Sequence, residues 1–210
     1  MVEKQATFTT GDWLLHCYFG AGQVMGTETK QVSGGEKTYY KIETSNSTLW
    51  LPIEGLDESK IRPISTPEEF EEAINELRKL PEEMDPNAPE RKKKIEEVKL
   101  INIPAETARL VRDLWERQWS ERGLYDWERE AWRFLSSRLV QEWTLCVGIS
   151  AIEARQRLIQ ILRQRGLGDE KEEEIKPAIS GRTLLDALAD EDGKWSGWLS
   201  KAVNQPGEPI

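Results

Sequence analysis

The chain has 210 residues, 38% of them hydrophobic and 32% charged, which is enough for one large domain or two small ones. It has no run of about eighteen apolar residues and no apolar stretch close to Met1. We therefore expect neither a membrane-spanning helix nor a secretory signal peptide, and a cytoplasmic location. Cys17 and Cys146 are the only cysteines, too few for a disulfide framework or a zinc site.

The net charge of −9 is unevenly spread along the chain. Residues 1–84 hold 8 Lys and Arg against 15 Asp and Glu, and residues 166–210 hold 5 against 10. Residues 85–165 hold 16 against 13, so this middle part alone is net basic, and its basic side chains cluster at 91–94. Because local potential decides whether a phosphate backbone is attracted, the acidic total does not exclude a nucleic-acid partner.

Residues 8–63 have the pattern of a small β-barrel. Glycine- and serine-rich turns at 33–35 and 45–47 separate β-branched or aromatic runs of strand length. These runs are Trp13–Cys17, Gly22–Thr27, Thr38–Glu43 and Thr48–Pro52. Gly20 and Gly22 follow an apolar run, where glycine permits the positive φ angles and close backbone approach that a curled sheet needs. We predict a five-stranded barrel of the SH3 or Tudor type.

A helix is predicted to begin after Thr66. Pro67 suits the first helical position and Glu69 completes a capping box with Thr66. An apolar stripe follows, formed by Phe70, Ile74 and Leu77. The helix is expected to end near residues 80–81, before a proline-rich linker over residues 85–89.

Four more helices are predicted after this linker, each from apolar residues at helical spacing. The first helix has Ile95, Val98 and Leu100 on its apolar face, and the second has Leu110, Val111, Leu114 and Trp115. The third has Trp127, Trp132, Leu135, Leu139 and Trp143, and the fourth begins with a capping box at Ser150–Glu153. The second helix is expected to begin at residues 102–104 and to reach about 122–123. The third is expected to span Tyr125–Cys146, and the fourth to end at 165–166. Short loops favour antiparallel neighbours in a compact bundle.

Together these patterns predict an α+β protein. We expect a barrel at residues 1–65, a helix and linker at 66–88, an all-α helical bundle at 89–166 and an acidic extension at 167–210. The extension has one helical patch at 183–188 and two apolar anchors, Trp195 and Trp198. The sequence shows no phosphate loop, catalytic carboxylate pair or metal-ligand spacing, so we expect no enzyme, no metal and no cofactor.

The two halves together resemble the CarD family of bacterial transcription regulators. The matching residues in the first half are Phe8, Gly11-Asp12, Leu14-Leu15-His16, Gly20, Gly22, Val24, Lys37, Tyr39–Ile42, Leu51-Pro52 and Ile61-Arg62-Pro63. Those in the second half are Ala108, Val111-Arg112-Asp113-Leu114, Arg117, Arg122-Gly123-Leu124, Glu128, Leu135, Leu139 and Glu142. The resemblance covers about residues 8–165, and the first module also occurs in transcription-repair coupling factors.

The resemblance implies a non-enzymatic function at the promoter. The barrel docks on the RNA polymerase β subunit, partly by pairing an edge strand, and main-chain hydrogen bonds can supply such docking. The helical domain contacts promoter DNA at the upstream edge of the bubble without reading sequence, and changes open-complex stability. Family members often carry a wedging tryptophan just before the first bundle helix. Ala88 stands at that position here, and alanine cannot prop open a base step.

The residues assigned to polymerase binding are Lys30, Leu49, Trp50, Leu51 and Pro52. The resemblance retains Lys30 as a basic residue after Glu-Thr, whereas Trp50 replaces a basic residue that some members place before the Val-Pro pair. Strand alternation alone would turn Leu49 and Leu51 inward and Trp50 outward. An exposed tryptophan on an edge strand is a hot-spot candidate.

The residues assigned to DNA backbone contact are Arg91, Lys92, Lys93 and Lys94. The competing interpretation is a solvated helix face, neutralised by Glu90, Glu96 and Glu97. His16, Cys17 and Cys146 are expected to pack in the interior. Most of the helical tryptophans are also expected in the core, with Trp119 or Trp127 as the exceptions. These tryptophans are Trp115, Trp119, Trp127, Trp132 and Trp143.

Two other functions stay open at this point. The first is a protein-interaction adaptor that docks on RNA polymerase or another partner without touching DNA, which the net charge and Ala88 favour. The second is an enzyme with a site between the domains, for which the single histidine, His16, offers little support.

Overall fold

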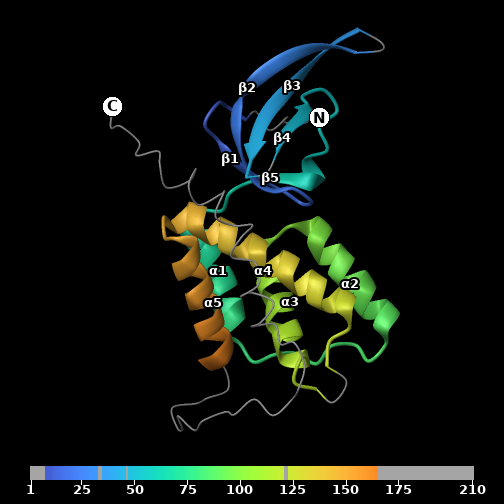
Figure 1. Ribbon diagram of the computed structural model, residues 1–210, viewed down its shortest axis with the longest axis vertical. Coiled ribbons are helices and arrows are strands. Elements are labelled where there is room, and N and C mark those ends of the chain that lie inside the picture. The colour runs from blue at the N-terminus through green and yellow to red at the C-terminus, as the bar shows by residue number, and fades with distance from the viewer. Residues whose placement is uncertain (1–7, 33–34, 46, 121–122, 165–210) are drawn as a thin grey trace, which may run out of the picture. The chain divides into compact units, whose positions relative to one another are not determined.

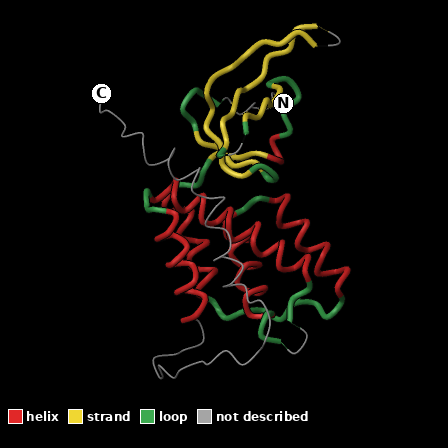
Figure 2. Tube along the Cα trace, viewed as in Figure 1, coloured by secondary structure: helices red, strands yellow, loops and turns green. Residues whose placement is uncertain are grey.

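The computed structural model describes residues 8–32, 35–45, 47–120 and 123–164. The acidic extension expected at 167–210 lies outside these residues. The described chain forms two compact units, one running to Ile64 and including Leu100–Asn102, the other holding Ser65–Lys99 and the residues from Ile103 onward. Strands make up the first unit and helices the second (Figure 2). The predicted α+β class is confirmed.

The first unit is a five-stranded antiparallel sheet with the order β4-β3-β2-β1-β5. Its strands are β1 (Trp13–His16), β2 (Gly20–Val32), β3 (Gly35–Thr44), β4 (Thr48–Pro52) and β5 (Ile61–Pro63), with a short 3₁₀ turn at Glu58–Lys60 before β5. The β2–β3 hairpin extends well past the shorter strands (Figure 1). Strands β2 and β3 are longer than the sequence suggested, and residues 33–34 and 46 of the two predicted turns lie outside the described residues.

The glycines at the β1–β2 turn have the roles expected of them. Gly20 has a φ of +74°, in the left-handed region that favours glycine. Gly22 of β2 lies close to β3, and a Cβ added to Gly22 would stand 2.6 Å from the Ile42 Cγ2. The curled sheet closes over a core of Phe8, Leu14, Val24, Tyr40, Ile42 and Ile61. Tight turning and close approach at these two glycines thus allow the core to form.

Gly22→Ala is expected to destabilise the protein by about 1–3 kcal/mol, because a methyl group there overpacks a fully buried site. The Ile42 side chain cannot move away freely, since it is 0% exposed. Urea titration followed by circular dichroism measures the loss. Ile42→Ala should make the Gly22→Ala effect smaller in the double variant than in the wild type, and additive effects would contradict the proposed clash.

The second unit contains five helices. They are α1 (Pro67–Arg78), α2 (Ala88–Ile101), α3 (Pro104–Arg117), α4 (Asp126–Val147) and α5 (Ala151–Gln164). The capping box predicted at Thr66 is confirmed, with Thr66 and Glu69 each accepting the backbone N–H of the other. At the start of α5 the Ser150 Oγ accepts the Glu153 N–H at 3.1 Å. Helix α2 begins at Ala88, inside the stretch that the sequence suggested as a linker.

Apolar and aromatic side chains hold these helices together. Phe70 of α1 packs on Trp143 of α4, with ring centres 5.7 Å apart, and Trp115 of α3 packs on Trp132 at 5.9 Å. The Trp132 indole N–H donates to the Val111 carbonyl at 3.2 Å. Since α1 packs on α3, α4 and α5 within this unit, it groups with the helices that follow it, whereas the sequence suggested a separate segment at 66–88.

Side-chain exposure and helix polarity in the helical unit can be compared with what the sequence predicts. Trp119 is 43% exposed and Trp127 is half-buried, so the two tryptophans named as exceptions are those that leave the core. Leu100, expected on an apolar face, is exposed. Across the described residues, each helix is too short or too polar to cross a bilayer.

Candidate functional site

The candidate polymerase surface centres on Trp50 of β4. Trp50 pairs with Lys41 across β3 and β4. The Lys30 Nζ, from β2, lies 3.0 Å from the centre of the indole ring, and the Lys41 Nζ lies 5.5 Å from it. The electron-rich ring face attracts both ammonium groups. Sequence reasoning identified Lys30 and Trp50 but missed Lys41, because only the strand register shows that it adjoins Trp50.

Strand β4 has side chains that pack on the barrel core and a main-chain edge at one end of the sheet. Leu49 and Leu51 are partly buried and pack against the barrel core, as strand alternation requires. All four residues of 49–52 are half-buried, and Trp50 and Pro52 do not belong to this core cluster. Because β4 stands at one end of the strand order, its outer main-chain edge can accept a partner strand.

The basic run at the start of α2 splits into two kinds of residue. Lys92, Lys93 and Lys94 are exposed. Arg91 is 2% exposed, and its Nε donates to the Glu128 Oε1 at 2.7 Å. A buried carboxylate holds the Arg91 charge inside the helical unit, which argues against the predicted contact of Arg91 with DNA.

Glu128 organises this part of the helical unit. Its side chain is 0% exposed, and its Oε1 also accepts from the Arg117 Nε at 3.2 Å. Its Oε2 accepts the Tyr125 N–H at 2.9 Å, which caps α4. The Arg91 guanidinium also donates hydrogen bonds to the carbonyl oxygens of Asp85 and Pro86, at 2.8 and 2.9 Å. One carboxylate thereby connects α2, α3 and the start of α4.

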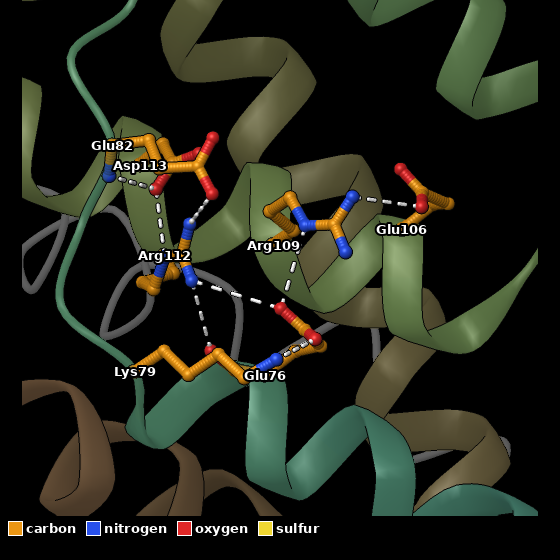
Figure 3. A network of polar contacts seen from close by, with 7 residues as sticks. All are labelled: Glu76, Lys79, Glu82, Glu106, Arg109, Arg112 and Asp113. Atoms are coloured by element: carbon orange, nitrogen blue, oxygen red, sulfur yellow. Dashed lines mark hydrogen bonds and ion pairs between the residues drawn. The ribbon is translucent and has the colours of Figure 1, made fainter.

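Arg112 and Asp113, the buried polar residues of the Val111-Arg112-Asp113-Leu114 pattern, belong to a second polar network (Figure 3). The Arg112 Nε donates to the Asp113 Oδ1 at 2.7 Å, and its guanidinium lies 3.8 Å from the Glu76 Oε2. The Asp113 Oδ1 also accepts the Glu82 N–H at 3.0 Å. This network joins α1, the segment after it and α3. The pattern that carries the resemblance in the helical half is thus part of the packing of these helices.

Glu76 makes the stability of this network dependent on pH. Its pKa lies below the usual value because the Lys79 ammonium hydrogen-bonds to its carboxylate, with Arg109 adding a weaker contribution. A lowered folded-state pKa contributes stability above the ordinary value of 4.5, and that stability is lost as pH falls through the lowered pKa.

Glu76→Gln is therefore expected to flatten the decline of the urea midpoint with falling pH, measured from about pH 6 to about pH 3. The matched control is Glu72→Gln, an exposed glutamate on the same helix, which should retain the wild-type decline. Equal slopes for the two variants would contradict the assigned role of Glu76.

Other predicted interior residues lie where expected in the barrel. His16 is buried, and its Nδ1 accepts the Tyr18 N–H at 3.1 Å. Cys17 is buried, whereas Cys146 is only partly so. Among the residues that the structure describes, no group of three or more His, Cys, Asp or Glu side chains could hold a metal ion.

Comparison with known families finds a match for the barrel. Residues 8–65 match the family model of the CarD-like/TRCF RID domain. The match begins at Phe8 of the barrel core and ends after β5. The match supports a CarD-like RNA-polymerase-interacting domain in this part of the chain. The predicted resemblance is confirmed there. The match stops before α1, so the resemblance of the helical half stays a prediction.

Proposed function

We propose that the protein is a non-enzymatic regulator of transcription initiation. Its barrel binds the β subunit of RNA polymerase through β4, and its helical unit contacts promoter DNA near the upstream edge of the bubble and modulates open-complex stability. The observation that carries the proposal is the match of residues 8–65 to an RNA-polymerase-interacting domain. In the structure that domain has an edge strand with a tryptophan, and two lysine ammonium groups lie 3.0 and 5.5 Å from its ring centre.

The polymerase surface combines two sources of affinity. The outer edge of β4 offers main-chain groups to a partner strand. Trp50 offers a large apolar face, held in one orientation by Lys30 and Lys41, so little conformational freedom is lost on binding. The two ammonium groups favour a partner strand with acidic side chains beside it.

Trp50→Ala combined with Lys30→Glu is expected to weaken capture of RNA polymerase by the full chain about tenfold or more. Binding is measured by titrating labelled full-length protein with polymerase. Trp119→Ala, which removes a tryptophan at 43% exposure from the helical unit, is the matched control and should bind as the wild type does. Wild-type affinity in the double variant would exclude β4 as the docking surface.

The DNA contact is proposed for Lys92, Lys93 and Lys94, which are exposed near the start of α2. They contact phosphates without reading bases, so their effect should depend strongly on salt. Ala88 cannot act as a wedge, so electrostatic contact is the mechanism that this helix offers.

Lys92→Glu with Lys93→Glu is expected to reduce the salt dependence of the promoter shift formed with polymerase, by about one in slope for each lost phosphate contact. The charge-matched control is Arg157→Glu with Arg163→Glu, two exposed residues of α5. If the lysine variant keeps the wild-type slope and still captures polymerase, the adaptor function without DNA contact is correct. The burial of Arg91 and the net charge of −9 favour that alternative.

A further inference from the structure

The helical unit has a groove of about 630 Å³ that the proposed function does not use. Its walls are the segment after α1 and the end of α3. Trp119 lines the groove just past the last residue of α3. Its backbone N–H donates to the Glu116 carbonyl at 3.1 Å. Apolar contributions from the opposite wall come from Pro81, Met84 and Pro86. Trp119 is 43% exposed, so part of its indole surface faces solvent.

The charges around this groove have one dominant sign. Four carboxylates line it, those of Glu82, Glu83, Asp113 and Glu116, against the single guanidinium of Arg117. Arg117 lies 3.2 Å from buried Glu128, and Asp113 and Glu82 lie 2.7 and 3.6 Å from Arg112, so carboxylates still outnumber the cations at this groove. The groove therefore has a negative potential beside an open aromatic face, a combination that attracts cations and repels phosphates.

We propose that this groove binds a basic peptide segment, with an Arg or Lys side chain over the Trp119 indole and its charge directed to Glu83 and Glu116. The aliphatic part of such a side chain packs on the indole ring and on Met84, while its cationic end pairs with the carboxylates of Glu83 and Glu116. The lining of this groove contains no lysine of α2, although Glu83 and Met84 also line the neighbouring hollow beside Lys93 and Lys94. The groove would therefore add a second partner surface to the protein.

The probe is a fluorescein-labelled peptide of four Arg-Ala repeats, titrated with the full chain and followed by anisotropy, with four Glu-Ala repeats as its acidic counterpart. The basic peptide should bind and the acidic one should not, and binding should weaken as salt rises. Trp119→Ala and Glu83→Lys should each weaken binding about tenfold. Both residues are exposed, so the thermal unfolding midpoint of each variant should stay at the wild-type value.

A chain of net charge −9 attracts cations over much of its surface, so matched controls decide the result. Trp50→Ala and the charge-matched Glu72→Lys, an exposed residue of α1, should leave peptide binding unchanged. Equal weakening by Glu72→Lys, or wild-type binding by Trp119→Ala, would overturn the proposal. So would the absence of peptide binding. None of these readouts involves polymerase, so this proposal and the proposed function can fail separately.

Discussion

Glu128→Gln is expected to lower the free energy of unfolding by about 3–5 kcal/mol, since it leaves two largely buried guanidinium groups without their carboxylate. Arg91 and Arg117 both donate to the same Glu128 oxygen, and their side chains are 2% and 16% exposed. Glutamine keeps the shape and can accept one hydrogen bond, but it cannot balance either charge. Urea unfolding followed by circular dichroism measures the loss.

The control for this variant is Glu130→Gln, an exposed residue of α4 that lies outside the network. It should change stability by less than about 0.5 kcal/mol. Arg91→Met should be less harmful than Glu128→Gln, because Glu128 then keeps Arg117 as its partner. A Glu128→Gln protein as stable as the control would show that this carboxylate does not organise the helices.

The network also bears on the proposed DNA contact. Arg91 holds the carbonyl oxygens of Asp85 and Pro86, so it fixes the chain as it enters α2. Lys92, Lys93 and Lys94 follow it directly. Loss of Glu128 should therefore weaken any effect of these lysines on the promoter complex even though their charges remain.

Local patterns in the sequence predicted local structure well. The capping box at Thr66 predicted the start of α1, and Gly20 predicted a turn with positive φ. Both features depend on residues within a few positions of each other, so spacing alone was sufficient. Helical spacing also contained the signal for Arg91, which stands four residues before buried Ile95 and seven before buried Val98. Its grouping with the neighbouring lysines obscured that signal.

Contacts between distant segments could not be predicted in this way. Glu128, the partner of Arg91, lies 37 residues away, and nothing in the spacing selects it from the other glutamates. Lys41 became part of the Trp50 surface only through the register of β3 and β4. The groove at Trp119 likewise depends on where the segment after α1 crosses the end of α3. Tertiary packing decides such neighbours, so they had to come from the structure.

Arg112→Met is the second substitution with a large expected effect, a loss of about 3 kcal/mol in the free energy of unfolding. Arg112 is 1% exposed and stands between Asp113, Glu76 and Glu82. Methionine fills a similar volume but leaves the Asp113 carboxylate, itself largely buried, without its cation. Arg112→Lys keeps a charge but loses the planar fork, so its cost should lie between those of the wild type and Arg112→Met.

Arg109→Met is the matched control, the same change on the same helix at a side chain 36% exposed, with an expected cost below about 1 kcal/mol. Adding Asp113→Asn to Arg112→Met should recover part of the loss, because asparagine removes the stranded charge and still accepts the Glu82 N–H. If Arg112→Met were no more harmful than Arg109→Met, the Val-Arg-Asp-Leu pattern would need a role other than packing. Arg112 would then have to become exposed in a complex, since a side chain this enclosed contacts no second molecule in the free protein.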